Sequence, residues 1–259
     1  KFNAGDGDIL YDHSGNGNHG TINGATWVEN IEGCTDSYAE NYNPDANWDD
    51  GSCTYPDNGD YSLQFDGEDD YVEVLDSPTF FLGNSDFTFQ VDVLFKSFPG
   101  GCSGGDNPYI FGWFLNSDDA IMLGRYCNNT IRFIIDQGEV VLIDADVINE
   151  IDVWYNFTIT KSENNYKLYQ NSVLIGAVTS ALPYPDVAAN LIIGGTSPSS
   201  QQNLHHGEID NLRFWNIALP QEEISSNMLQ TINYTSLDLI SNYKFNAGSG
   251  DILYDHSGN

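Results

Sequence analysis

Basic residues are scarce in this sequence, in which Lys and Arg number 8 against 38 Asp and Glu, giving a formal net charge of −30. A surface with this charge repels the phosphates of nucleic acids and the headgroups of anionic lipids, so we expect no nucleic-acid partner. Long apolar stretches are also missing. None approaches the roughly 18 residues that cross a bilayer, and we expect no membrane insertion of this chain. Intrinsic disorder is not expected either, because 40% of the residues are hydrophobic and 13% are aromatic.

The most informative feature that is present is a repeat. Residues 1–16 (KFNAGDGDILYDHSGN, the N-terminal copy) recur as residues 244–259 (KFNAGSGDILYDHSGN, the C-terminal copy), with Asp6 replaced by Ser249. This spacing far exceeds the roughly 20 to 50 residues of a solenoid repeat, so each repeat should be a whole domain. We therefore expect one domain at 1–243, followed at 244–259 by the start of the next repeat in a tandem array. Neighbouring copies of the repeat are the expected partners, and an ordered free terminus is the alternative.

Short stretches of alternating polar and apolar residues predict strands. In the clearest of them Phe87, Phe89 and Val91 point one way while Thr88 and Gln90 point the other, which is the period of a sheet with one packed face. Strands are expected at 61–65, 71–74, 87–95, 109–115, 131–136, 140–143, 154–160, 166–170, 191–193 and 208–215. One helix is predicted at 220–228, where Pro opens the first turn and acidic residues follow. These elements predict an all-β, two-sheet antiparallel sandwich with one short helix.

Four blocks of sequence make the fold prediction more specific. They are the opening KFN with GDILYDHSGNGNHGTINGATWV, then SLQFDGEDDYVEV, FTFQVDVLF and GEIDNLRFWNIALPQEEI. In order and spacing they resemble the laminin G-like, concanavalin A-like jelly-roll family, in the variety found in bacterial surface proteins. The resemblance implies a jelly-roll sandwich in which the KFN strand starts the domain and the GEIDNLRFWN strand nearly completes it.

An acidic segment at 33–55 (GCTDSYAENYNPDANWDDGSCTY, the cassette) does not fit this pattern, and we interpret it as an insert. It resembles a short cassette of secreted bacterial proteins. In its acidic character it is also similar to thrombospondin-type calcium repeats. A disulfide between Cys34 and Cys53 would close it, which leaves Cys102 and Cys127 for a second disulfide. Between the first two cysteines lie oxygen donors that suit calcium: Asp36, Asn43, Asp45, Asn47, Asp49 and Asp50. Calcium is the expected cofactor, and a metal-free loop held by the disulfide is the alternative.

A second candidate calcium site involves the turn DHSGNGNH, which begins at Asp12. The family resemblance implies that this turn lies near the aspartate of the late strand, Asp210, and that a structural calcium joins the two. Asp12, Asn16 and Asp210 are then the expected ligands. A turn in which Asp12 and Asn16 cap backbone amides without a metal is equally consistent with the sequence.

Catalysis is not expected, although the resemblance includes glycosidases. Such enzymes place carboxylates at alternate positions of one strand, with a nucleophile and a general acid about 5 Å apart. Glu208 and Asp210 come closest to this pattern, but strict alternation puts Leu212 and Phe214, and no acid, at the next positions on that face.

Four aromatic residues are candidates for stacking on sugar rings, and each of them could equally belong to the core: Tyr109, Trp113, Tyr126 and Trp154. We therefore expect a non-catalytic, calcium-stabilised module of an extracellular or cell-surface adhesin or filament, with glycan binding as the alternative activity. The even number of cysteines agrees with an oxidising, extracellular setting.

Overall fold

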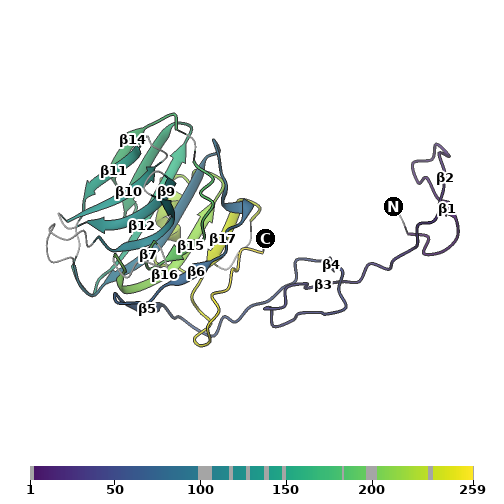
Figure 1. Cartoon of the computed structure of the whole chain (residues 1–259), viewed down its shortest axis with the longest axis horizontal. Coiled ribbons are helices and arrows are strands. Elements are labelled where there is room, and N and C mark those ends of the chain that lie inside the picture. Colours follow the sequence, from purple (N-terminus) through teal and green to yellow (C-terminus); the bar gives the residue numbers. More distant parts are fainter. Residues whose placement is uncertain are drawn as a thin grey trace. The chain divides into compact units, whose positions relative to one another are not determined.

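The alternating segment Phe87–Phe95 forms a central strand in one of two antiparallel sheets that pack against each other in the computed structural model (Figure 1). The structure describes residues 3–98, 107–116, 119–126, 129–136, 140–147, 150–182, 184–196, 203–232 and 236–258. The chain divides into two compact units, Lys1–Thr54 and Tyr55–Asn259, which we call the N-terminal unit and the sandwich.

The two sheets of the sandwich confirm the predicted all-β architecture. The first sheet has six strands, in spatial order β11 (Val140–Asp146), β10 (Thr130–Asp136), β9 (Asp119–Tyr126), β8 (Tyr109–Asn116), β15 (Leu191–Ile193) and β6 (Val72–Val74). The second has seven, in the order β14 (Val173–Thr179), β13 (Asn165–Gln170), β12 (Trp154–Ser162), β7 (Phe87–Phe95), β16 (His206–Trp215) and β17 (Leu239–Tyr243), with β5 (Leu63–Asp66) also paired to β16. The strands β9, β14 and β17 were not expected from the sequence.

The core lies between the two sheets and is rich in aromatic rings. Phe89 on β7 meets Phe214 on β16 edge-to-face at 4.8 Å between ring centroids, and Phe111 on β8 at 6.0 Å. All three side chains are at most 1% exposed. Because burying one such side chain contributes roughly 1.5 to 3 kcal/mol, this alternating set stabilises the sandwich most.

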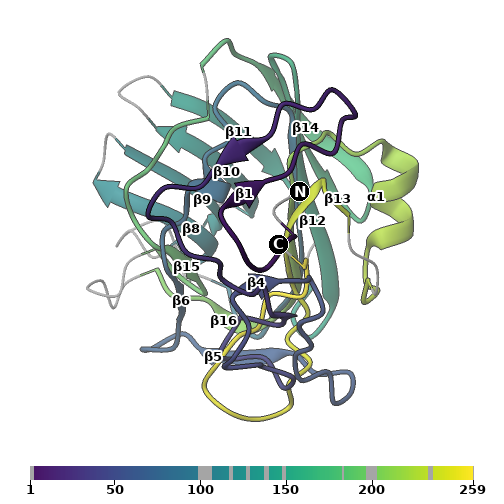
Figure 2. The same ribbon diagram turned by 90° about the vertical axis from the view of Figure 1, so that its right-hand side faces the viewer.

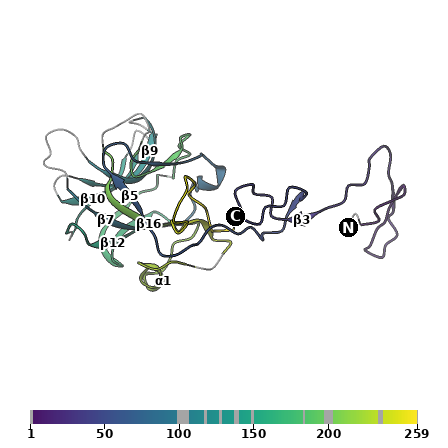
Figure 3. The same cartoon turned by 90° about the horizontal axis from the view of Figure 1, so that it is seen from below.

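The outer face of the seven-stranded sheet is partly covered by α1 (Gln221–Asn227), which confirms the predicted helix (Figure 3). Pro220 precedes its first turn, and the amide of Gln90 on β7 donates to the carbonyl of Ile224 in the helix at 3.2 Å. A single 3-10 turn, η1 (Pro78–Phe80), precedes β7. Across the described ranges, no helix has the length and apolar character required to span a membrane.

The C-terminal copy is part of the sandwich. Phe245 is 6% exposed and belongs to the core, and Lys244 Nζ lies 2.9 Å from Asp57 Oδ2. Asn246 Oδ1 accepts the backbone N–H of Tyr61 at 3.1 Å, and the yellow C-terminal segment runs beside β5 in Figure 2.

This arrangement differs from the expected division into 1–243 and 244–259. The sandwich is built from residues 55–258, and the N-terminal copy lies in the other unit instead of starting the domain. The physical reason is the continuity of β17 with the KFN motif. Pairing of β17 with β16 carries Phe245 directly into the core, so residues 244–258 complete this sandwich.

The N-terminal unit contains two short ladders. Antiparallel β1 (Ile9–Leu10), within the N-terminal copy, pairs with β2 (Gly20–Thr21), and parallel β3 (Glu32–Gly33), at the start of the cassette, pairs with β4 (Trp48–Asp49) inside it. The predicted disulfide Cys34–Cys53 is confirmed, with an S–S distance of 2.06 Å. Cys102 and Cys127, predicted to form the second disulfide, lie outside the described residues.

Removing the cassette disulfide is expected to destabilise the N-terminal unit by about 3 kcal/mol, because a crosslink over a loop of this length restricts the unfolded chain. Hydrogen exchange in a Cys34→Ser/Cys53→Ser variant should therefore rise strongly at residues 31–54. Exchange at Phe87–Phe95 serves as the internal control, because β7 belongs to the other unit. Unchanged protection of the cassette amides would contradict this expectation.

Candidate functional site

The outer face of the seven-stranded sheet carries two adjacent rows of side chains that include carboxylates. In the first row, Asp92 on β7 lies opposite Asn156 on β12 and Asp210 on β16. In the second row, Leu94 on β7 lies opposite Trp154 and Glu208. The ladder thus brings Trp154 and Asp210, predicted separately as a sugar-stacking residue and a calcium ligand, to one place.

A β-bulge in β16 changes which residues share this face. The register shifts between Asp210 and Arg213, and Asn211 takes a positive φ of 50°. Leu212 and Phe214, which strict alternation placed beside Asp210, are fully buried in the core instead. Arg213 takes the next position on the outer face, opposite Gln90. The expected alternation was therefore wrong beyond Asp210, although it remains true that no acid follows there.

Buried hydrogen bonds fix Asp92. Its Oδ1 accepts the side-chain amide of Asn156 at 2.7 Å, and its Oδ2 accepts that of Asn211 at 3.1 Å. The Oδ1 of Asn211 in turn accepts from the Arg213 guanidinium at 2.6 Å. Since Asp92 is 1% exposed and both its oxygens are bonded, it forms the floor of the site and not a reactive group.

Above this floor lies a hollow of about 380 Å³, which we call the Trp154 pocket. Its wall comes from residues 60–62, which precede β5, from β12 and β16, and from the segment after α1. The lining residues are Asp60, Tyr61, Ser62, Asp92, Trp154, Glu208, Asp210, Asn211, Leu229 and Thr231. Its volume falls within the range of pockets that hold small ligands.

The electrostatics of the pocket are dominated by desolvated carboxylates. Burial, followed by the nearby charge of Asp92, raises the pKa of Asp210 to about 7. Burial also raises the pKa of Asp92, against the lowering effect of its hydrogen bond from Asn156. The negative charge of Glu208 has polar partners: its Oε2 accepts the Ser62 hydroxyl at 2.9 Å, and its Oε1 lies 3.4 Å from Lys96 Nζ. The pocket therefore favours neutral or cationic ligands over anions.

The other three aromatic candidates are buried, Trp113 in the core and Tyr109 and Tyr126 on the outer face of the six-stranded sheet, so their assignment to ligand binding stays a prediction. Trp113 is 2% exposed and packs against Phe214 in the core at 5.5 Å. Tyr109 and Tyr126 are each 9% exposed and share a hydroxyl hydrogen bond of 2.7 Å. The Arg132 guanidinium covers the ring of Tyr126 at 4.0 Å, so this face cannot stack on a sugar. Alternation along β8 places Trp113 inward with Phe111, which is the core position that the sequence left open for it. Tyr126 alternates with the core residue Leu123 and therefore faces outward, where the ring of Tyr109 joins it.

The oxygen donors of the cassette mostly cap backbone amides. Five of the six accept a backbone N–H: Asp36, Asn43, Asn47, Asp49 and Asp50. Four of these bonds go to the residue two positions later, as in Asx turns. In residues 33–55, which are all described, no three carboxylates lie close enough together to share an ion. Calcium in the cassette stays a prediction.

The turn at Asp12 has the same capping chemistry. Asp12 Oδ1 accepts the N–H of Ser14 at 2.8 Å and its Oδ2 accepts that of Asn18 at 3.0 Å, which holds the pKa of Asp12 at about 2. Asn16 donates to the Ser14 hydroxyl at 3.1 Å. Asp210 belongs to the sandwich and Asp12 to the N-terminal unit, so a calcium ion joining them also stays a prediction.

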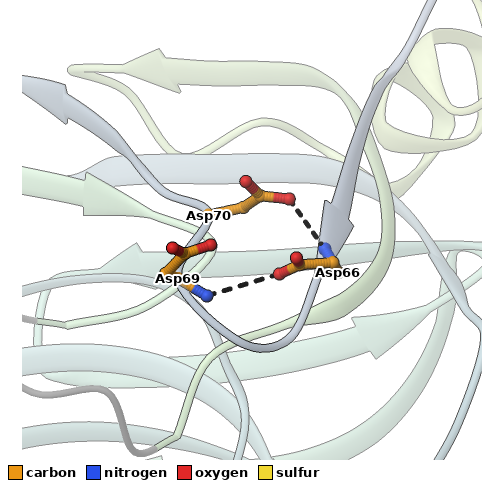
Figure 4. A group of neighbouring side chains, drawn as sticks. All are labelled: Asp66, Asp69 and Asp70. Atoms are coloured by element: carbon orange, nitrogen blue, oxygen red, sulfur yellow. Dashed lines mark hydrogen bonds between the residues drawn. The ribbon is translucent and has the colours of Figure 1, made fainter.

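The sequence FDGEDDYV, which begins at Phe65 and is typical of a hairpin with acidic side chains, holds a third acidic cluster. Asp66, Asp69 and Asp70 place carboxylate oxygens within 4.8 Å of one another in the turn that leads from β5 to β6 (Figure 4). Asp66 accepts the N–H of Asp69 at 3.3 Å, and Asp70 accepts that of Asp66 at 2.9 Å. These bonds account for the cluster as a tight exposed turn.

Comparison with known proteins agrees with this architecture. Residues 66–225 match the family Laminin_G_3, described as the concanavalin A-like lectin/glucanases superfamily. No curated protein matches the chain. The fold is similar to that of a candidate carbohydrate-binding protein from Bacteroides ovatus, with a TM-score of 0.61 and 16% identity over 76% of this chain. The chain spans 55% of the length of that protein.

Two carbohydrate-binding structures are similar in the same way. One is the CBM40 module of a Ruminococcus gnavus sialidase bound to α2,3-sialyllactose (TM-score 0.52, 14% identity, 64% of this chain and 95% of that one). The other is domain 4 of AbnA, an extracellular arabinanase of Geobacillus stearothermophilus, in complex with arabinotriose (TM-score 0.51, 15% identity, 70% and 82%). At these identities the similarity concerns the fold alone. Since the family match spans more than half of the sequence, the chain belongs to the concanavalin A-like lectin/glucanases superfamily.

Proposed function

We propose that this chain is a non-catalytic carbohydrate-binding module of an extracellular adhesive protein, and that its ligand binds in the Trp154 pocket. The observation that carries the proposal is the pairing of a partly exposed indole with hydrogen-bonding groups in one hollow. Trp154 and Tyr61 offer apolar ring faces, while Glu208, Asp210 and Thr231 offer hydrogen-bonding groups. A pyranose has an apolar face and a polar edge, so it matches such a surface.

The charge of the pocket narrows the class of sugar. Four carboxylates line it, against two nearby cations: Lys96, 3.4 Å from Glu208, and Arg213, whose charge lowers the pKa of Asp92 and of Asp210. In the metal-free pocket, uronic and sialic acids would bring a further negative charge into this field, which costs free energy. Neutral sugars and amino sugars are therefore the proposed ligands.

Several observations support a binding role over a hydrolytic one. A glycosidase needs two accessible carboxyl groups on either side of the scissile bond. Of the pocket carboxylates, Asp92 is buried with both oxygens hydrogen-bonded, and Glu208 is held by the Ser62 hydroxyl and Lys96. On β16 the bulge places Arg213, and not an acid, at the next outward position after Asp210. The fold shared with carbohydrate-binding modules and the Cys34–Cys53 disulfide are consistent with a module that works outside the cell.

Calcium is proposed as the stabilising ion of this module. Asp60, Glu208 and Asp210 line the Trp154 pocket, and carboxylate oxygens are the donors that calcium prefers. An ion there would supply positive charge beside Asp210, whose ionised form is disfavoured by burial. Among the described residues, Asp66, Asp69 and Asp70 form the one group of three carboxylates that converge closely enough to share an ion, so the pocket carboxylates would have to move together to bind calcium. The effect of the ion on stability is tested together with that of Asp210 below.

Binding of neutral and amino-sugar oligosaccharides should depend on Trp154. Loss of a stacked indole from a binding site commonly costs at least about 2 kcal/mol, so Trp154→Ala should weaken affinity roughly 30-fold in isothermal titration calorimetry. Trp48→Ala is the matched control, because Trp48 is 60% exposed and lies in the N-terminal unit. Equal binding by the wild type and the Trp154→Ala variant would place the site elsewhere, and no binding to any neutral or amino sugar would overturn the proposal.

A further inference from the structure

The segment that follows α1 places a leucine in a strained backbone conformation. Leu229 has a φ of 54°, in the left-handed region that disfavours residues with a Cβ. Among the described residues, the other non-glycine positions with positive φ hold Asn, Asp, Glu or Ser, apart from Phe245. Phe245 belongs to the core, whereas Leu229 is 48% exposed. Packing in the core therefore does not account for Leu229.

The end of the helix α1 explains the conformation but not the residue. Met228 is the C-cap of α1, so Leu229 holds the next position, where a left-handed residue commonly ends a helix. Glycine is the usual residue there because it has no Cβ to clash with the backbone, and asparagine is the main alternative. A leucine at this position is strained and leaves about half of its side chain in water, so folding alone does not favour it.

Hydrogen bonds on both sides hold the backbone of Leu229 in place. Its N–H donates to Asp92 Oδ1 at 3.3 Å. The Arg213 guanidinium donates to the carbonyl of Asn227 at 2.9 Å and also to that of Gln230. Asp92 and Arg213 lie on the central strands of the seven-stranded sheet and are at most 1% exposed. They fix the segment to the rigid sandwich, so the leucine is in position before a ligand arrives.

The side chain held in this way lines the Trp154 pocket. Asp92, which binds the N–H of Leu229, lies on β7 two residues before Leu94, the residue opposite Trp154. Leu229 and Trp154 therefore lie over neighbouring rows of the same sheet face. Together with Tyr61 they supply the apolar part of the lining, and the other lining residues are polar or carry carboxylates.

The chemistry of an aliphatic group beside an indole narrows what the two side chains can contact. A metal ion or a small polar ion gains nothing from a leucine, because neither has apolar surface to bury. A pyranose ring carries C–H groups on its faces and hydroxyl groups at its edge. It can bury the exposed half of Leu229 while its hydroxyl groups reach the polar lining.

We propose that Leu229 is a sugar-contacting residue of the Trp154 pocket, and that its strained backbone is kept for that contact. Its side chain packs on the C–H face of the bound sugar beside Trp154, while Asp92 and Arg213 position it. This inference rests on the proposed function and adds to it a second apolar contact, outside the strands of the sheet.

Isothermal titration calorimetry with neutral and amino-sugar oligosaccharides tests the contact through three substitutions. Leu229→Ala and Leu229→Gly remove the apolar group and should both weaken affinity about fivefold, which corresponds to the burial of half a leucine side chain. Leu229→Met supplies an apolar side chain again and should recover most of that loss. Leu237→Ala is the matched control, because Leu237 is 90% exposed and does not line the pocket, and it should bind as the wild type does.

Thermal melts of the same variants report on the backbone independently of binding. Glycine tolerates a left-handed conformation better than alanine, so Leu229→Gly should melt roughly 2 to 4 °C above Leu229→Ala. At an ordinary position the order would be reversed. If Leu229→Ala melts above Leu229→Gly, the backbone is not strained at this residue and the proposal is overturned.

The binding results separate this inference from the proposed function. If Trp154→Ala weakens binding and both truncations of Leu229 leave it unchanged, the pocket binds sugar without Leu229, and only this inference is overturned. If Leu229→Met binds as weakly as Leu229→Ala, the loss does not come from an apolar contact, and the inference is again overturned. If the wild type binds no neutral or amino sugar, the proposed function is overturned together with the inference.

Discussion

Replacement of Phe245 by alanine is expected to lower the free energy of unfolding of the sandwich by about 3 to 5 kcal/mol, the cost of truncating a buried phenylalanine. Phe245 is 6% exposed and belongs to the main core. Its neighbours anchor the segment on both sides, through the Lys244–Asp57 ion pair and the hydrogen bond from Tyr61 to Asn246. The C-terminal copy thus contributes to the stability of the sandwich that precedes it in the chain.

Chemical denaturation of the variant measures this loss. Tyr11→Ala is the control, because Tyr11 lies in the N-terminal copy and is 52% exposed, so its truncation should leave the sandwich transition unchanged. If Phe245→Ala unfolds at the same denaturant concentration as the wild type, residues 244–259 do not belong to this sandwich. The division at residue 243 that the repeat suggests would then describe the domain better.

The second large effect is expected at Asp210. Burial raises the pKa of Asp210 to about 7, whereas in the unfolded chain it has the ordinary value near 3.8. Between these values the folded state binds the proton more tightly, so the contribution of Asp210 to stability is fully present below pH 4 and is lost as the pH rises through about 7. At 1.36 kcal/mol per pKa unit, the full loss is on the order of 4 kcal/mol in the absence of divalent cations.

An Asp210→Asn variant should lack this loss. In a chelator it should be more stable than the wild type at pH 7.5 and about equal to it at pH 4, because the amide is neutral at both. Asp238→Asn is the control, since Asp238 is exposed. Calcium at pH 7.5 should raise the melting temperature of the wild type more than that of Asp210→Asn, because it stabilises the ionised carboxylate. If the stability of the wild type and that of Asp210→Asn change with pH in the same way, Asp210 does not have a raised pKa. If the wild type melts at the same temperature in calcium and in chelator, it does not bind calcium.

The sequence was sufficient for the fold because several strands alternate clearly and four blocks resemble the jelly-roll family, although β8 and β16 carry register shifts that break strict alternation. Phe87 to Phe95 is the clearest case, and all of its residues are buried. The strand β17 was missed because LISNY has no alternating pattern, and its partner β16 is distant in the sequence. The repeated segment was interpreted as a domain boundary. Its near-identity gives the length of one repeat, but it does not give the residue at which each domain begins.

The site was only partly predictable. Trp154 and Asp210 were each singled out, but their proximity depends on the register of three strands far apart in the chain. Asp92 was missed, although a carboxylate between Val91 and Val93 on an alternating strand signals an outward polar position. The bulge at Asn211 leaves no pattern in a single sequence, since a positive φ at asparagine is common in turns as well.

The indole resonances of the five tryptophans give the most direct test of the proposed function. In an NMR titration with a neutral or amino-sugar oligosaccharide, the Trp154 indole signal should shift, assigned with a Trp154→Phe variant. Trp113 and Trp215 are each 2% exposed, and Trp27 and Trp48 lie in the N-terminal unit, so their signals should stay in place. A saturable shift confined to Trp154 is the predicted result. Saturable shifts at Trp27 or Trp48 with Trp154 unmoved would contradict the proposed site.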